Sequence, residues 1–170
     1  AKRQRKISSI FNTNREEIIY ASKINFETNI YNQFFNTENK KINTKYITGN
    51  YLRVFPIFSI SAETPLKIKN FKNNLTYTPK LKLVVTPGMS NSNKISNEDS
   101  SINTYTIENN SNLNRYSGTD KLDNSKRLDL SLNIKNNIFN ANIWSTYEFT
   151  NNSNYHYLQN NDKNLSDFLG

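Results

Sequence analysis

Alternation of apolar and polar residues with a period of two is the feature that most constrains this chain. From Leu75 to Val85 the odd positions are apolar or Pro, and the even positions are mostly Thr and Lys. Successive side chains of a β-strand point to opposite faces, so this run predicts one apolar and one polar face. A helical period is weak throughout, and the sequence therefore predicts an all-β chain.

The same alternation recurs in other parts of the chain. It appears in Leu52–Ala62, in Leu128–Ile134, with the phase flipped in Phe139–Phe149, and nearer the N-terminus in Ile18–Phe34 and Ile7–Phe11. We interpret these runs as about six strands, with a possible seventh starting near Leu165. Most are longer than the five or six residues usual in globular proteins. A tilted strand of about 9–11 residues crosses a bilayer, so membrane-spanning strands are favoured.

The expected connections alternate in length. Short links are expected near Thr13–Arg15, Asn70–Asn74 and Asn136–Asn137, and long loops near 36–49, 87–125 and 151–164. Outer-membrane barrels alternate short periplasmic turns with long extracellular loops. We therefore expect residues 1–170 to form a single partial β-barrel segment, an antiparallel up-and-down meander from a large transmembrane outer-membrane β-barrel. A secreted β-sandwich that binds a partner through its loops stays as an alternative.

Composition excludes several classes of protein. The 170 residues contain no Cys, so neither disulfides nor Cys-based metal sites are possible, and no apolar stretch is long enough for a membrane-spanning helix. Hydrophobic residues make up 35%, a low share that suits strands with only one dry face. The formal net charge of +8 fits either an anionic cargo or a codon bias toward Lys and Asn.

Catalytic motifs are missing from the sequence. It contains no Gly-x-Ser-x-Gly, Walker or His-Glu-x-x-His motif, and its one histidine, His156, stands among Asn and Tyr residues typical of a surface loop or aromatic girdle. Glu98–Asp99 could bind a divalent cation, although a solvated acidic loop explains the pair more simply. We expect no enzyme activity, no cofactor and no metal.

The two faces of the expected strands receive different roles. We predict that Leu81, Leu83, Leu130, Leu132, Ile143 and Phe149 face lipid. The candidate lumen cations on the opposite face are Lys80, Lys82, Arg127 and Lys135. The basic cluster Lys2–Lys6 could bind nucleic acid or phosphate, but the alternating run after it favours a charged strand end at the membrane rim. Nucleic acid is therefore not an expected partner.

The long loop carries the most specific motif. It reads Asn97-Glu98-Asp99-Ser100, then Asn114-Arg115-Tyr116-Ser117-Gly118-Thr119-Asp120-Lys121, and Arg127 opens the next strand. With Arg53-Val54-Phe55-Pro56, Glu63-Thr64-Pro65-Leu66, Thr78-Pro79 and Leu165–Gly170, this order resembles the LPS-assembly outer-membrane protein family (LptD), in its alphaproteobacterial version. The chain departs from the family pattern at Asn110-Ser111, Lys121 and Thr78, where the family has Leu-Phe, Arg and Glu.

The resemblance implies a non-catalytic lipid-transport role. Members are large barrels in the outer membrane of Gram-negative bacteria that receive lipopolysaccharide from periplasmic bridge proteins and insert it into the outer leaflet. A lipoprotein plug (LptE-like) sits inside the barrel. The chain would be an internal fragment of such a barrel, without the periplasmic domain and the closing strands. Another outer-membrane barrel, such as a receptor or channel, is the alternative.

The resemblance also identifies candidate structural residues in the loop. These are Asn97, Glu98, Asp99, Ser100, Asn114, Arg115, Gly118 and Asp120. We expect Arg115 to pair with Asp99 or Asp120 and thereby to hold the loop folded over the barrel mouth. Gly118 has no Cβ and would permit a tight bend.

Overall fold

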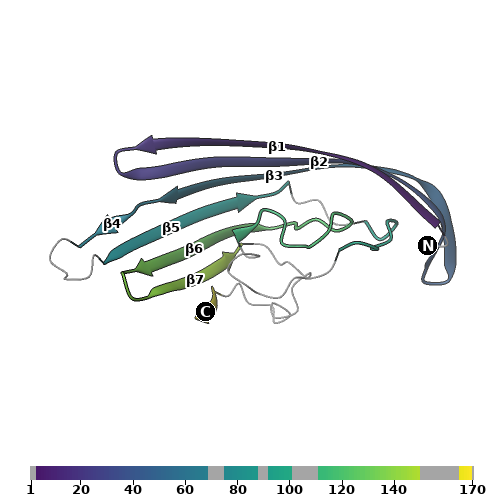
Figure 1. Ribbon diagram of the computed structural model, residues 1–170. Helices are drawn as coiled ribbons and strands as arrows, with labels where there is room; N and C mark the ends of the chain where they lie inside the picture. Colours follow the sequence, from purple (N-terminus) through teal and green to yellow (C-terminus); the bar gives the residue numbers. More distant parts are fainter. Residues whose placement is uncertain (1–2, 69–74, 88–91, 101–110, 150–164, 170) are drawn as a thin grey trace.

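The computed structural model describes residues 3–68, 75–87, 92–100, 111–149 and 165–169, which form one antiparallel sheet (Figure 1). Its strands are β1 (Arg3–Ile19), β2 (Ser22–Ile42), β3 (Lys45–Glu63), β4 (Leu66–Lys67), β5 (Thr76–Val85), β6 (Lys126–Lys135), β7 (Asn140–Glu148) and β8 (Leu165–Leu169). The order is β1-β2-β3-β5-β6-β7-β8, and the short β4 pairs with β5. The predicted all-β antiparallel meander is confirmed. Within the described ranges, no helix has the length and apolar character needed to cross a membrane.

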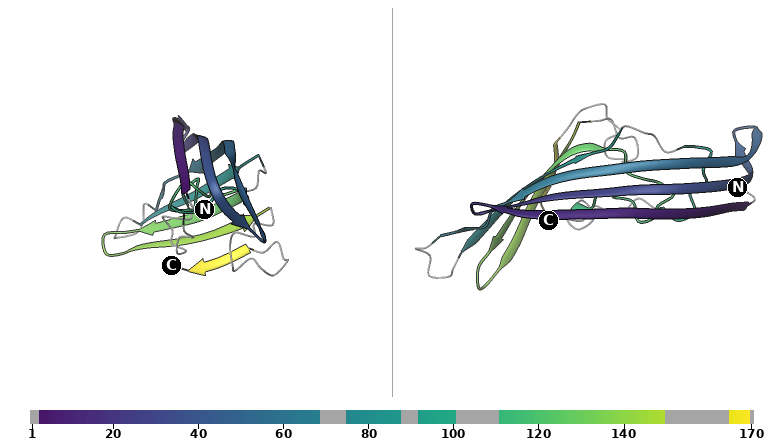
Figure 2. Two further views of the ribbon diagram at one scale, coloured as in Figure 1. Left: turned by 90° about the vertical axis from the view of Figure 1, so that its right-hand side faces the viewer. Right: turned by 90° about the horizontal axis from the view of Figure 1, so that it is seen from above.

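The strands fall into two length classes. Strands β1 to β3 have 17, 21 and 19 residues, whereas β5 to β7 have 10, 10 and 9. At about 3.3 Å per residue the longest strand measures roughly 70 Å and the shorter ones roughly 30 Å. Strands β1 to β3 consequently run far beyond the end of β5 to β7, as the view from above shows (Figure 2).

Two expected connections are wrong. Residues 36–49 are the outer ends of β2 and β3, which meet at Asn43 and Thr44, and the expected link at 13–15 lies inside β1, whose turn to β2 falls at Tyr20 and Ala21. Both segments are rich in Asn and Thr, and Asn is common in turns. A strand with two polar faces lacks the apolar alternation that would distinguish it from a turn. The strict alternation of short and long connections is therefore also wrong.

Asn residues accommodate the irregular backbone of the β2–β3 hairpin. Asn39 and Asn43 adopt left-handed φ angles of 49° and 53°, a conformation that Asn tolerates better than most residues. Asn39 stands at a register shift between Thr37 and Lys40, and its N–H donates to the Thr48 hydroxyl at 3.0 Å.

Other expected connections agree with the structure. Asn136 and Asn137 lie in the four-residue connection between β6 and β7, and a strand does begin at Leu165. The described parts of the expected 87–125 loop contain no strand. Residues 69–74, the expected loop at 151–164 and His156 lie outside the described residues.

The connection between β5 and β6 is here called the β5–β6 loop (residues 86–125), and its described segments pack against one face of the sheet. Its two longer described segments run along the extensions of β1 to β3 (Figure 1). Loop residues Leu113 and Leu122 join an apolar cluster with sheet residues, each at most 6% exposed; these are Tyr31, Phe55, Ile57 and Val84. Burying such side chains is worth about 1.5–3 kcal/mol each, so the loop adds a core to this side of the sheet.

Candidate functional site: the two faces of the sheet

The sheet has an inner face, which the β5–β6 loop contacts, and an outer face opposite to it. Along β3, Arg53, Phe55, Ile57, Ser59 and Ser61 point inward and are buried, and the residues between them point outward. Three of those outward residues, and Leu52 just before them, are large, apolar and exposed; the three are Val54, Phe58 and Ile60. The inner face of β3 is therefore covered by the loop, whereas its outer face exposes apolar side chains.

On β2, β3 and β5 to β7 the outward apolar residues form a band. They occupy residues 24–34 on β2, 52–62 on β3, 77–85 on β5, 128–134 on β6 and 141–149 on and directly after β7, interrupted by Thr28, Asn32 and Ser145. Each run is roughly 7–11 residues long, close to the 9–11 residues that a tilted strand needs to cross a bilayer. The band keeps this height although the strands themselves vary from 9 to 21 residues.

The band shifts along the sheet from one group of strands to the next. On β2 and β3 it begins at the paired residues Phe34 and Leu52, beyond the last β5 partner, Val85. On β5 to β7 it continues past the end of β3 to the row of Tyr77, Ile134 and Ala141. A diagonal shift of this direction is what strands tilted relative to a horizontal band produce.

The residues expected to face lipid all lie in this band. Leu81, Leu130, Ile143 and Phe149 are exposed on the outer face, and Leu83 and Leu132 are half-buried there. Their position on one face agrees with the sequence pattern, and their contact with lipid stays a prediction.

On the inner face, two aspartates of the loop hold each other's backbone. The Asp120 carboxylate accepts hydrogen bonds from the backbone N–H groups of Glu98 and Asp99 at 2.8 and 3.1 Å. The Asp99 carboxylate accepts hydrogen bonds from Thr119 and Asp120 N–H at 3.0 and 2.7 Å. The Lys6 ammonium on β1 bridges both carboxylates at 2.5 and 2.6 Å. We call Lys6, Asp99 and Asp120 the aspartate clasp.

Gly118 makes this arrangement possible through close approach. A Cβ on Gly118 would overlap the backbone carbonyl of Asp99, which leaves no room for any other residue. Its role is therefore proximity between the two loop segments. Asn97 and Ser100 close the neighbouring turn, since the Asn97 amide donates to the Ser100 carbonyl at 2.6 Å and its oxygen accepts from Ser100 N–H at 3.0 Å.

Side chains of the sheet also hold the clasp, by donating hydrogen bonds to backbone carbonyls of the loop. The Arg53 guanidinium donates to the carbonyls of Thr119 and Asp120 at 2.6 and 2.8 Å, and the Gln33 amide donates to Thr119 at 3.0 Å. Gln33 in turn accepts from Arg53 at 2.5 and 2.8 Å, and Arg53 lies over the Phe35 ring. The clasp is thus tied to β1, β2 and β3.

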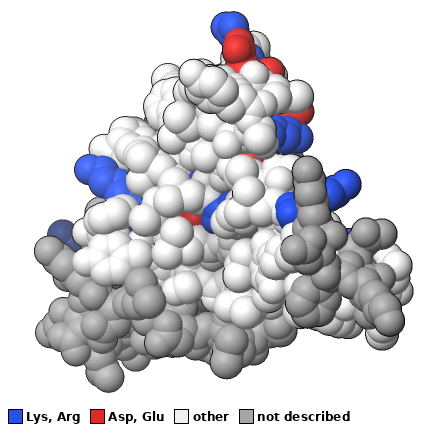
Figure 3. All heavy atoms as spheres, turned by 90° about the vertical axis from the view of Figure 1, so that its left-hand side faces the viewer, with Lys and Arg blue, Asp and Glu red and all other residues white. Residues whose placement is uncertain are grey.

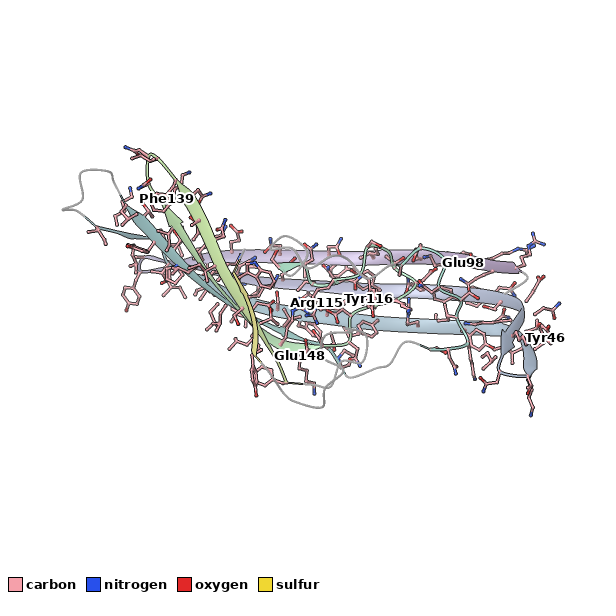
Figure 4. The ribbon with its side chains drawn as sticks, turned by 90° about the horizontal axis from the view of Figure 1, so that it is seen from below. Tyr46, Glu98, Arg115, Tyr116, Phe139 and Glu148 are labelled. Carbon is pink, nitrogen blue, oxygen red and sulfur yellow. The ribbon has the colours of Figure 1, made fainter. Side chains whose placement is uncertain are left out.

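A second charged group, here called the arginine cluster, ties the loop to β6 and β7. Asp123 accepts hydrogen bonds from Arg115 at 2.5 and 3.3 Å and from Arg127 at 3.1 Å. Arg115 also binds Glu148 at 2.9 Å, and Arg127 binds Asp129 at 3.0 Å. All five side chains belong to residues at most 9% exposed. Arg115, Tyr116 and Glu148 lie together at mid-length, while Glu98 lies nearer the Tyr46 hairpin (Figure 4).

The expected partner of Arg115 is corrected by this geometry. Arg115 pairs with Asp123 and Glu148, and not with Asp99 or Asp120 as expected. Asn114 helps to set the geometry, because its side-chain oxygen accepts from Asp123 N–H and its amide donates to the Gly118 carbonyl, both at 3.0 Å. The backbone thereby brings Asp123 within reach of Arg115.

Two loop groups have shifted acidities. Partial burial raises the pKa of Asp99, but hydrogen bonds from Lys6, Ser100 and Asp120 N–H outweigh it and hold the pKa well below its usual range. Burial raises the pKa of the Tyr116 phenol, and the nearby Asp123 carboxylate raises it further against the opposing effect of Arg115. Asp99 therefore stays ionised and Tyr116 neutral over the ordinary pH range.

A comparison with protein families matches residues 12–168 to LPS transport system D (LptD). The chain belongs to the LptD family. No curated protein matches the chain at a significant level. The family is an outer-membrane, β-barrel lipid-transport family of Gram-negative bacteria that serves lipopolysaccharide transport, and the antiparallel sheet agrees with that assignment. The alphaproteobacterial type stays a prediction.

The candidate lumen cations of this LptD-family chain occupy different surroundings on the inner face. Lys82 and Arg127 are buried, and Lys82 donates to Glu27 at 3.2 Å and to the Ser111 carbonyl at 2.7 Å. Lys80 is half-buried 3.9 Å from Glu63, and Lys135 is exposed near the β6–β7 turn. Lys82 and Arg127 are engaged by the protein itself, whereas Lys80 and Lys135 are the more accessible cations.

Sequence reasoning missed several residues of this LptD-family site. Asp123, Glu148 and Gln33 were not singled out, and Arg53 was noted only as part of a motif. Gln33, Arg53 and Glu148 could have been recognised as charged or amide side chains on the polar face of a predicted strand, the face that a long loop can cover. The Lys6 ammonium lies between the carboxylates of Asp99 and Asp120. Among the described residues, no group of three or more Asp, Glu, His or Cys side chains is arranged to hold a metal.

Proposed function

We propose that this chain forms part of the wall of the outer-membrane translocon that inserts lipopolysaccharide into the outer leaflet, without catalysis. In this proposal the apolar band meets the hydrocarbon core and the inner face lines the lumen. The end that carries the β5–β6 loop faces the cell exterior. The turns at residues 20–21 and 136–139 face the periplasm, as short turns do in outer-membrane barrels.

The diagonal apolar band is the observation that carries the proposal. A water-soluble sheet has no reason to expose an apolar band of about 7–11 residues on strands whose lengths range from 9 to 21 residues. On the inner face, Arg53, Lys82 and Arg127 are buried under the loop, a polar arrangement suited to a lumen. Family membership then supplies the cargo class.

We propose two kinds of protein partner. A lipoprotein plug (LptE-like) would occupy the lumen, and periplasmic bridge proteins would deliver lipopolysaccharide to the turn end. Support for both comes from the family. The inner face of β5 to β7 near that end is also polar and only partly covered, with Lys80, Ser131 and Asn133 half-buried there.

Depletion of the protein tests the transport role. Surface lipopolysaccharide, measured by labelling intact cells, should fall as the protein is depleted and recover when it is restored. A receptor or channel would leave surface lipopolysaccharide unchanged, and that result would contradict the proposal.

Site-directed spin labelling tests the lipid-facing band. Leu130→Cys lies on the outer face and its neighbour Ser131→Cys on the inner face of the same strand. The nitroxide at position 130 should be relaxed by oxygen, which concentrates in lipid. The label at 131 should respond to a water-soluble nickel reagent. The reverse pattern would overturn the assignment of the faces.

A further inference from the structure

The outer face carries an excess of positive charge at one edge of the apolar band. The band ends at the row Ile7–Phe34–Leu52. The next outward row contains Arg5, paired with Asn36, and the row after it contains Arg3. The apolar surface therefore gives way to cationic side chains within a single row.

Two further cations lie on the outer face on this side of the band. Lys126 on β6 lies directly next to the band residue Leu128, whereas Lys41 on β2, opposite Tyr46, lies seven residues beyond the band residue Phe34, roughly 20 Å farther along the extension. We call Arg3, Arg5, Lys41 and Lys126 the cationic rim; all four are exposed. On β6 the diagonal shift places the edge of the band at Leu128, and Lys126 is the next outward residue beyond that edge.

The two faces of β1 divide the basic N-terminal cluster between two roles. Gln4 binds the backbone of Ser96 and Lys6 binds the aspartate clasp, so both point inward. Arg3 and Arg5 alternate with them and point outward, away from the loop. Arg5 faces Asn36 and Arg3 faces Glu38 across the strand pair, so neither arginine takes part in the loop contacts that engage Lys6.

The opposite edge of the band is balanced in charge. On the outer face of β1, Arg15 pairs with Glu17 at 2.5 Å in the rows of Phe26 and Ile24, and on the inner face nearby Lys23 pairs with Glu16 at 2.8 Å. The view from the turn end shows both signs of charge together at its top, where β1 and β2 turn (Figure 3). At the rim, Glu38 is the one outward carboxylate among the described residues. A general excess of Lys codons would not produce this asymmetry between the two edges.

We propose that the cationic rim binds the phosphate groups of phosphorylated lipids in the leaflet around it. The inference rests on the proposed function, which places this edge at the outer surface of the membrane. Guanidinium groups bind phosphate oxygens in a bidentate manner, and exposed Lys and Arg near an anionic lipid surface add to membrane binding.

The experiment compares lipid retention by charge-matched variants of the whole protein. The protein is placed in phosphatidylcholine vesicles that contain either phosphorylated or dephosphorylated lipid A, and the lipid retained after detergent extraction is measured by native mass spectrometry. The rim variant is Arg3→Gln/Arg5→Gln/Lys41→Gln. The control, Arg15→Gln/Lys23→Gln/Lys67→Gln, removes the same charge at the turn end.

The rim variant should retain phosphorylated lipid A less well by roughly tenfold to a hundredfold, with no loss in the control. Glu38→Gln should increase retention, and added salt should weaken it in the native protein. Equal retention by rim and control variants, or equal retention of the dephosphorylated lipid, would overturn the proposal. The oxygen accessibility of a label at position 130 reports separately on the proposed function, so a failure of the rim is distinguishable from a failure of the barrel assignment.

Discussion

The aspartate clasp and the arginine cluster hold the same loop with the same kind of interaction but in different surroundings. In the cluster, the side chains of Arg115, Asp123 and Arg127 are at most 2% exposed. In the clasp, the side chains of Lys6 and Asp99 are 23% and 39% exposed, and the Asp120 side chain is 3% exposed. Solvent screens Lys6 and Asp99 more than the charges of the cluster, so equal distances at the two places imply unequal energies.

Because the arginine cluster is buried, removing a charge from it should lower the free energy of unfolding more than removing a charge from the clasp. Asp123→Asn would leave Arg115 and Arg127 buried together without the carboxylate that bridges them. Breaking a buried pair in this way costs about 3–5 kcal/mol. We expect a large loss of folded protein, measured by heat-modifiable migration on gels.

The matched control for Asp123→Asn is Glu17→Gln. Glu17 also pairs with an arginine at 2.5 Å, but its side chain is 44% exposed. Surface pairs of this kind contribute about 0–1 kcal/mol, so the control should migrate as the native protein does. Similar losses of folded protein in both variants would show that burial does not make the Asp123 pairs more stabilising than the exposed Glu17 pair.

A second prediction concerns the two described glycines that face close neighbours. Gly118→Ala places a methyl group against the Asp99 backbone, whereas Gly49→Ala meets only the end of the Tyr51 side chain at 3.0 Å. Overpacking against fixed structure costs about 1–3 kcal/mol, and a flexible side chain can move aside. Hydrogen exchange in residues 97–100 and 118–120 should accelerate in Gly118→Ala and stay native in Gly49→Ala. Native exchange in both would mean that the two loop segments have room to separate.

Lys6→Gln tests the clasp with a smaller expected effect. The substitution removes the ammonium from two carboxylates, but Asp99 and Asp120 keep their backbone hydrogen bonds and Arg53 keeps its two carbonyls. We expect a loss of about 1 kcal/mol, the upper range for a partly exposed pair. Faster exchange should be confined to the clasp. Faster exchange around Asp123 as well would show that the two places act as one unit.

The sequence predicted the sheet better than it predicted these contacts. Period-two alternation is a local property, so strands such as β5 and β6 and the outward phase of Leu81 and Leu130 follow from it directly. The extensions of β2 and β3 were missed because polar residues on both sides remove the alternation. The partners of Arg115 lie 8 and 33 residues away in the chain, and only the folded loop determines that Asp123 and Glu148 are nearer than Asp99.

Acid should loosen the aspartate clasp, and alkali should loosen the loop at Tyr116, which lies next to the arginine cluster. Both effects are absent near neutral pH. The pKa of Asp99 is lowered in the folded state, so its stabilising contribution is fully present above about 3.9, the unfolded value, and is lost as the pH falls further. The pKa of Tyr116 is raised, so its contribution is present below about 10 and is lost as the pH rises through the folded value. Hydrogen exchange, corrected for its intrinsic pH dependence, should therefore accelerate at residues 97–100 below about pH 4, and at residues 114–116 above about pH 10. Acceleration of both segments in acid alone would show that the clasp governs the docking of the whole loop.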